Sequence, residues 1–195
     1  MSKIVVSGGN GYLFNHIKPL LHDELIYTSN IFLYQDFINV DMVIHFASPS
    51  DKEDFKNPYI HKTMIDGTIN MVDLAKRNNA HFVFASTMGI YQLENDYCIF
   101  KYCMEKYIQK ELSSYSILRI PRVYSSDREK GLIKQIKENT ISKSDIDKKI
   151  KFILIRDFLT FFMYNYKNQG VFEIEEKYYQ IESIKHIKEK ICHII

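Results

Sequence analysis

A glycine-rich turn between an apolar run and a helical pattern constrains the fold of this chain more than any other feature. The segment Ile4-Val-Val-Ser-Gly-Gly-Asn-Gly-Tyr-Leu-Phe14 runs from a β-branched strand into the start of a helix. In that context Gly8 permits a tight turn and Gly11 lets the backbone approach a pyrophosphate, which the helix N-terminus would stabilise. A plain glycine-rich turn explains the same residues. The segment therefore predicts a strand–turn–helix unit and leaves the ligand open.

Short β-branched runs alternate with longer helical patterns along the rest of the chain, which predicts a parallel sheet with crossover helices. Near-continuous apolar strands suit a sheet covered on both faces. We therefore expect an α/β fold, a Rossmann-type doubly wound parallel sheet, with a small C-terminal substrate lobe. The expected domains are residues 1–124, which contain the glycine-rich turn, and, interleaved with them, the lobe at residues 125–195. The expected strands are residues 3–6, 25–28, 42–46, 81–85, 115–120, 150–155 and 171–174, and the expected helices are residues 11–22, 58–78, 97–112, 130–138, 156–166 and 183–193.

The stretch between Thr28 and Met42 is too short for the usual sheet. A strand, a helix and a second strand need about 30 residues as a βαβ unit, and far fewer are present here. At least one element of the usual sheet is therefore expected to be shortened or missing.

The charge balance and the cysteines narrow the function classes. With 26 basic and 24 acidic residues the net charge is +2, which gives no reason to expect nucleic acid or a membrane as a partner. Cys98, Cys103 and Cys192 show no Cys-x-x-Cys spacing, so a reduced, cytoplasmic protein is expected. We expect no signal peptide and no membrane span. The seven histidines lack ligand spacing, so no metal site is expected.

Tyr97 and Lys101 lie four residues apart within a predicted helix, so their side chains share one face. A phenol with a pKa near 10 is a poor base, but a neighbouring ammonium lowers that pKa. Tyr97 could then exchange a proton with a carbinol or ketone while hydride moves to or from a nicotinamide. A surface lysine beside a core tyrosine is the alternative. The preceding strand favours chemistry, because it ends in Thr87, whose hydroxyl could hold the substrate oxygen at the sheet edge where α/β proteins bind ligands.

These segments together resemble the extended short-chain dehydrogenases, in particular the NAD-dependent epimerase/dehydratase family that acts on nucleotide sugars. The resemblance covers most of the chain. The segments that carry it are Val6-Ser-Gly-Gly-Asn-Gly-Tyr-Leu, Asp41-Met-Val-Ile-His-Phe-Ala-Ser, Gly67-Thr-Ile-Asn-Met-Val-Asp-Leu-Ala, Phe82-Val-Phe-Ala-Ser-Thr-Met-Gly-Ile-Tyr91, Tyr97-Cys-Ile-Phe-Lys-Tyr-Cys-Met-Glu-Lys-Tyr107 and Leu118-Arg-Ile-Pro-Arg-Val-Tyr124.

The resemblance implies a role for each candidate residue. Thr87 is the catalytic hydroxyl that also holds the substrate, Tyr97 is the acid/base, and Lys101 binds the cofactor ribose and acidifies Tyr97. Arg122 would pair with the substrate diphosphate, although an exposed arginine without that role is an equal alternative. The implied cofactor-binding residues are Gly8, Asn10, Gly11, Tyr12 and Leu13 at the pyrophosphate, Ala47 on the adenosine side, Lys101 at the ribose and Pro121 at the nicotinamide.

Two departures from the family pattern bear on activity. Phe14 replaces the third glycine of the turn, so its ring must point away or push the helix outward. Met88-Gly89 follows Thr87 where dehydratases carry an acidic pair, which disfavours dehydration.

The resemblance thus predicts an NAD(P)-dependent nucleotide-sugar epimerase or 4-keto-sugar reductase that functions as a homodimer in polysaccharide biosynthesis. NAD and NADP stay open, because no acid or arginine follows Thr28 directly. Two further readings stay open. One is a catalytically degenerate Rossmann-fold binding protein or partner subunit, and the other is a sensor of the nicotinamide redox ratio.

Overall fold

The structure is a computed structural model that describes residues 1–28, 37–48, 57–93, 95–125, 127–128, 134–135, 138, 140 and 149–180. The chain divides into two units. Unit 1 comprises Met1–Ile120 and Phe161–Glu173, and unit 2 comprises Pro121–Thr160 and Ile174–Ile195. The expected helix at residues 183–193 and most of the expected helix at residues 130–138 lie outside the described residues.

Unit 1 is built on a six-stranded, fully parallel sheet in the order β2-β1-β3-β4-β5-β8. The expected doubly wound fold is confirmed. The next strand in the sequence, β2, lies on one side of β1, and β3 lies on the other side. The strand order therefore reverses at β1, and open α/β sheets bind ligands at such a switch point. The strands are β1 (Lys3–Ser7), β2 (Glu24–Thr28), β3 (Met42–His45), β4 (His81–Thr87), β5 (Tyr115–Ile120) and β8 (Gly170–Glu173).

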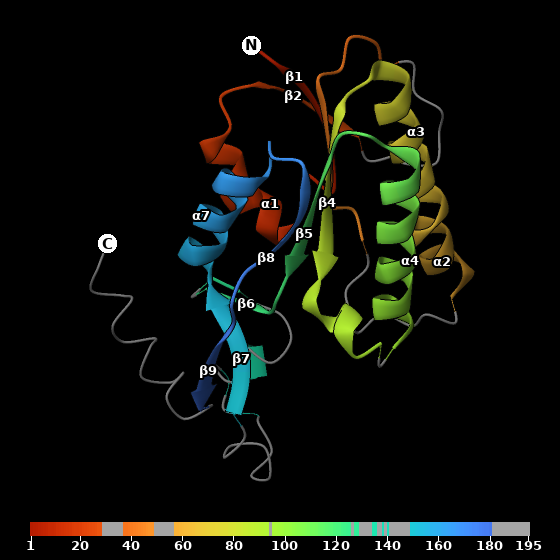
Figure 1. Cartoon of the computed structure of the whole chain (residues 1–195). Helices are drawn as coiled ribbons and strands as arrows, with labels where there is room; N and C mark the ends of the chain where they lie inside the picture. The colour runs from red at the N-terminus through yellow and green to blue at the C-terminus, as the bar shows by residue number, and fades with distance from the viewer. Residues whose placement is uncertain are drawn as a thin grey trace. The chain divides into compact units, whose positions relative to one another are not determined.

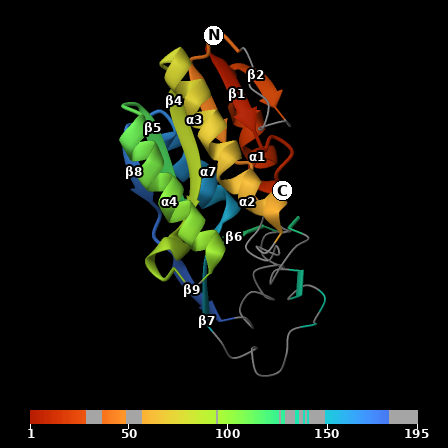
Figure 2. The same cartoon turned by 90° about the vertical axis from the view of Figure 1, so that its right-hand side faces the viewer.

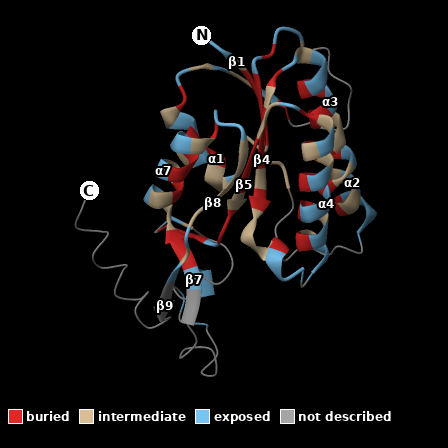
Figure 3. Cartoon of the chain, in the orientation of Figure 1, coloured by how far each residue is buried: buried red, intermediate tan, exposed pale blue. Residues whose placement is uncertain are grey.

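Helices cover both faces of this sheet (Figure 1). The short helix α1 and the last residues of α7 lie on one face, whereas α2, α3 and α4 lie on the other, as the turned view also shows (Figure 2). The central strands and the inward sides of the helices are buried (Figure 3). The helices are α1 (Tyr12–Ile17), α2 (Pro58–Met64), α3 (Asp66–Asn78), α4 (Asp96–Glu111) and α7 (Ile155–Asn165), and the 3-10 turns are η1 (Lys18–Leu20) and η2 (Met88–Tyr91).

The core between the sheet and the α3–α4 layer is aliphatic and aromatic. Because helices cover both faces of the sheet, its strands are continuous apolar runs in the sequence. Its central members are Val5, Val43, Met71, Val72, Leu74, Phe82, Phe84, Met104, Ile108 and Ile117, all of them buried.

Two expected helices differ from the sequence prediction. The helix expected at residues 11–22 ends at Ile17 and continues only as η1, because Pro19 lacks the amide that an α-helix needs. The helix expected at residues 58–78 is divided at Ile65 into α2 and α3. There the Thr68 hydroxyl donates to the carbonyl of Met64 at 2.7 Å, a bond that bends helices.

The edge of the sheet reflects the short stretch before Met42. Among the described residues no strand lies beyond β2, so β2 is the outer strand on that side. Residues 29–36, which make up most of that stretch, lie outside the described residues, so the expected shortened or missing element stays a prediction.

Unit 2 contains a small sheet in the order β6-β7-β9, with β6 parallel and β9 antiparallel to β7. Its strands are β6 (Val123–Tyr124), β7 (Lys149–Leu154) and β9 (Lys177–Gln180). The rings of Tyr124 and Phe152 pack together, with their centroids 5.4 Å apart. No helix among the described residues is both long enough and apolar enough to cross a bilayer.

Candidate active site

The glycine-rich turn connects β1 to α1 and lies against the residues that follow β3, at the switch point. Gly8 has a φ of 78°, and the amide of Gly11 closes the turn on the Gly8 carbonyl at 2.8 Å. A Cβ atom on Gly8 would lie 2.4 Å from the backbone nitrogen of Ala47. Only glycine suits this position, and it places the turn directly beside Ala47, the residue predicted for the adenosine side.

The start of α1 fits a pyrophosphate. Gly11 is the N-cap and has no side chain that could cap the first amides of the helix, which include those of Tyr12 and Leu13. Asn10 and Gly11 are exposed. Amides at a helix N-terminus can donate to an anion. The assignment of this turn to the cofactor stays a prediction, and α1 has only 6 residues.

Phe14 lies in the core of unit 1. Its side chain is 0% exposed. Its ring meets the rings of Tyr27 and Phe46 edge-on, with centroid distances of 6.2 and 6.1 Å. Aromatic packing therefore accommodates the residue that replaces the third glycine.

A buried histidine connects this turn to the α2–α3 break. The Ser7 hydroxyl bonds Nδ1 of His45, and Nε2 of His45 bonds the Thr68 oxygen at 3.0 Å. Burial, together with the charge of Lys101, lowers the pKa of His45 to about 3, so the ring is neutral. Because Thr68 gives its proton to the Met64 carbonyl, we assign the His45 proton to Nε2.

Lys101 and Tyr97 share one face of α4, as the spacing predicted. Lys101 is 3% exposed. Its ammonium donates to the Ala85 carbonyl at 2.6 Å and lies 5.6 Å from the centroid of the Tyr97 ring. It also lies 4.5 Å from the centroid of the Phe84 ring. Burial lowers the pKa of Lys101 to about 7, against the opposing charge of Glu105. The Tyr97–Lys101 pair is therefore held against the end of β4.

Thr87 ends β4 and begins the turn η2. Its oxygen accepts the Gly89 amide at 3.2 Å. A Cβ atom on Gly89 would lie 2.5 Å from Sγ of Cys98, so this turn lies directly against the residue that follows Tyr97. The structure thus brings the elements that carry Thr87, Tyr97 and Lys101 together in unit 1.

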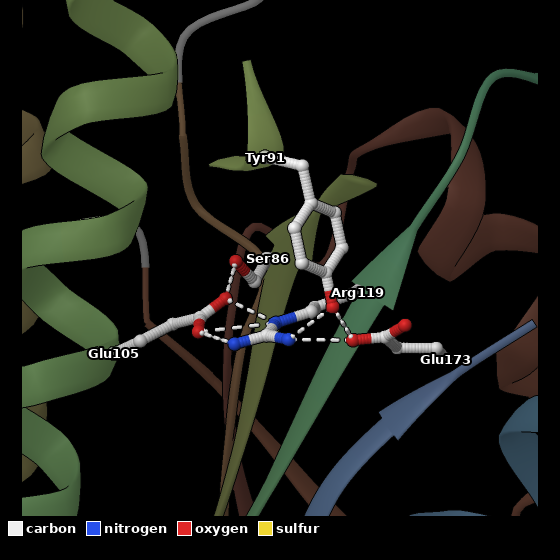
Figure 4. Close-up of polar contacts among 5 residues, drawn as sticks. All are labelled: Ser86, Tyr91, Glu105, Arg119 and Glu173. Atoms are coloured by element: carbon white, nitrogen blue, oxygen red, sulfur yellow. Dashed lines mark hydrogen bonds and ion pairs between the residues drawn. The ribbon is translucent and has the colours of Figure 1, made fainter. Parts of the chain in front are cut away.

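A polar cluster that the sequence reasoning missed lies beside these residues. Arg119 on β5 bonds the carboxylate of Glu105 on α4 and that of Glu173 on β8 (Figure 4). Ser86 donates to Glu105, and Tyr91 donates to Glu173. Glu105 and Arg119 both stand in segments that resemble the family, and Glu105 follows Lys101 by one helical turn. The spacing of four residues between Lys101 and Glu105 was the sequence signal that could have identified this cluster.

The two remaining predicted residues belong to unit 2. Pro121 directly follows β5 in the chain, and Arg122 is exposed. The Arg122 carbonyl accepts the Ile153 amide at 3.0 Å, which aligns β6 with β7. The backbone of Arg122 is therefore used in the small sheet, while the role predicted for its guanidinium stays a prediction.

Comparison with known proteins places these observations in a family context. The model of the NAD dependent epimerase/dehydratase family matches residues 22–170, more than half of the chain. The UDP-glucuronic acid decarboxylase 1 of Arabidopsis thaliana is 32% identical over 117 residues, which cover 46% of this chain and 27% of that protein. For UDP-glucuronic acid decarboxylase 6 of the same plant the values are 30% over 118 residues, 46% and 34%. The chain thus spans about a third or less of these curated relatives.

Solved structures share the fold at low sequence identity. A UDP-N-acetylglucosamine 4-epimerase from Methanobrevibacter ruminantium M1, in complex with UDP-N-acetylmuramic acid, superposes with a TM-score of 0.78 at 18% identity, over 98% of this chain and 82% of that chain. The Bordetella bronchiseptica enzyme WbmH in complex with NAD+ also gives 0.78, at 16% identity over 100% and 82%. At these identities the likeness establishes the fold.

Proposed function

Because the chain belongs to the NAD dependent epimerase/dehydratase family and therefore uses a nicotinamide dinucleotide, we propose that it acts on a nucleotide sugar as an epimerase or a 4-keto-sugar reductase. The lobe at residues 125–195 would hold the sugar nucleotide, with Arg122 at its diphosphate. The reaction would contribute to polysaccharide biosynthesis.

One observation carries this proposal: a buried ammonium lies beside a tyrosine at the end of a central strand. Lys101 faces the Tyr97 ring at 5.6 Å to its centroid. In its charged form Lys101 favours the phenolate of Tyr97, which lets Tyr97 take a proton from a sugar hydroxyl near neutral pH. The Thr87 oxygen already accepts the Gly89 amide, so its hydroxyl proton is the group that it would offer to the substrate oxygen.

The cofactor would be held by residues of unit 1. The amides at the start of α1 would bind the pyrophosphate, the turn at Gly8 would admit it, and Ala47 would line the adenosine. When bound, the nicotinamide supplies hydride transfer. Tyr27 and Thr28 end β2 and carry neither carboxylate nor guanidinium, so neither residue selects between NAD and NADP.

Met88 and Gly89 favour epimerisation or reduction over water loss. Dehydration needs a second acid and base beside the threonine, and neither residue after Thr87 can transfer a proton. The competing function is a non-catalytic partner subunit that keeps the fold. The 6-residue α1 and the aromatic residue at position 14 favour that alternative.

The deciding experiment combines turnover with binding. We expect turnover of a 4-keto-6-deoxy nucleotide sugar with NADPH or NADH, or of a UDP- or GDP-hexose with NAD(P)+. UDP-glucuronic acid belongs in the panel because of the curated relatives. Calorimetry should show dinucleotide binding that is weakened at least about tenfold by Lys101→Ala and unchanged by Lys106→Ala, an exposed lysine of the same helix. Binding without turnover would support the partner-subunit or sensor reading. Dinucleotide binding that Lys101→Ala leaves unchanged would contradict the assigned site.

We also propose a homodimer formed through α2 and α4. Tyr59 on α2 and both Ile99 and Tyr102 on α4 are exposed apolar side chains, a pattern typical of an interface. We expect sedimentation to give a dimer and Tyr102→Glu to give a monomer. Tyr164→Glu, at an exposed tyrosine on α7, is the matched control. A native monomer, or a dimer that survives Tyr102→Glu, would count against this interface.

A further inference from the structure

A row of polar side chains crosses three neighbouring strands of unit 1. Ser86 on β4 pairs in register with Arg119 on β5, which pairs with Glu173 on β8. Because paired residues project to the same face of a sheet, the three side chains lie side by side. Glu105 from α4 and Tyr91 from η2 meet this row (Figure 4).

The carboxylate of Glu105 is the buried centre of this cluster. It is 0% exposed. The Ser86 hydroxyl donates to one oxygen, and Arg119 contributes Nε at 3.2 Å and a terminal nitrogen at 2.7 Å. Arg119 is not committed to Glu105 alone, because its other terminal nitrogen bonds Glu173 at 2.5 Å and the Tyr91 oxygen at 2.8 Å. Glu105 therefore shares its partner with a second acid.

Glu105 also lies one helical turn after Lys101, so the two buried charges occupy the same face of α4. Consecutive residues of β4 hold them: Phe84 and Ala85 contact the ammonium, and Ser86 bonds the carboxylate. Among the described groups that act on Lys101, His45 is neutral and Glu105 is the acid. The Ala85 carbonyl is the hydrogen-bond acceptor that the ammonium uses.

We propose that Glu105 is a positioning residue that keeps the buried Lys101 ammonium charged, and that Arg119 limits this effect by sharing the same carboxylate. The physical basis is that a buried ammonium without a nearby negative charge loses its proton. Burial lowers the pKa of Lys101 while Glu105 raises it, which agrees with this geometry. The value of the charge for the reaction rests on the proposed function, but the coupling between the two residues does not.

The experiment measures the Lys101 titration in the full chain without cofactor or substrate. Lysine labelled with 13C at Cε gives a midpoint by NMR, with the signal assigned through its absence in Lys101→Met. We expect the native midpoint near 7 and a fall of about one pH unit or more in Glu105→Gln. Glu111→Gln is the matched control, because Glu111 lies on the same helix and pairs with Lys76. It should leave the midpoint unchanged.

An unchanged midpoint in folded Glu105→Gln, or an equal fall in Glu111→Gln, would overturn the proposal. If Glu105→Gln does not fold, a measurement on the native protein tests the proposal. The carboxyl carbon of Glu105 must then show an inflection at the Lys101 midpoint, and its absence overturns the coupling. Neither measurement uses a dinucleotide or a sugar, so failure here is distinguishable from failure of the proposed function.

Discussion

Replacing Arg119 by methionine is expected to lower the free energy of unfolding by about 3–5 kcal/mol. The guanidinium is 15% exposed, whereas the Glu105 carboxylate is 0% exposed. Methionine removes the partner and leaves a buried negative charge that only Ser86 contacts among the bonds described here. Denaturant unfolding followed by circular dichroism measures the change.

A double variant separates the buried charge from the loss of packing. Arg119→Met with Glu105→Leu should recover most of the lost stability, because a buried ion pair and a hydrophobic pair of similar volume are often equally stable. Lys76→Met breaks the exposed pair with Glu111 and should change little. A single Arg119→Met variant as stable as the native protein would contradict this prediction.

Replacing Tyr97 by phenylalanine is expected to lower kcat by about 10²- to 10⁴-fold. Phenylalanine keeps the ring beside Lys101 and removes only the hydroxyl that we propose exchanges the proton. Dinucleotide affinity should stay within about twofold of the native value, because the proposed bonds to the cofactor come from the glycine turn and Lys101. Steady-state rates with the substrate found in the panel, together with calorimetry, give both quantities.

Tyr102→Phe is the matched control for this prediction. Tyr102 lies on the same helix and is 38% exposed, so loss of its hydroxyl should leave kcat unchanged. If Tyr97→Phe retains the native rate, Tyr97 is not the acid/base, and another group near Thr87 must carry the proton.

The sheet could be predicted from the sequence because its strands are apolar runs with clear ends. The run before Gly8 and the run ending at Thr87 both gave strands within about two residues of the observed bounds. The break at Ile65 could not be predicted, because the apolar spacing continues from α2 into α3 without a change of phase. The Thr68 hydroxyl bonds the Met64 carbonyl at this break, and such a bond is visible only in the folded backbone. The early end of α1 did have a signal in Pro19.

Part of the candidate site could likewise be predicted from the sequence, and part of it could not. Spacing alone placed Tyr97 and Lys101 on one face of a helix, because four residues make about one turn. The degree of burial of Lys101, which shifts its pKa, depends on how closely β4 packs against α4. Arg119 lies in a segment that resembles the family, but no role for this residue was predicted from the sequence. Its contact with Glu105 depends on the register between β4 and β5, which no pattern within either strand reveals.

The discontinuity of unit 1 has a consequence for synthesis of the chain on the ribosome. β5 ends at Ile120, but its partner β8 begins only at Gly170. Throughout the translation of the intervening residues one edge of β5 is open to other strands. During that interval Arg119 also lacks Glu173. The nascent sheet gains its sixth strand only after Glu173 has left the exit tunnel, so the whole segment between β5 and β8 must emerge before unit 1 is complete.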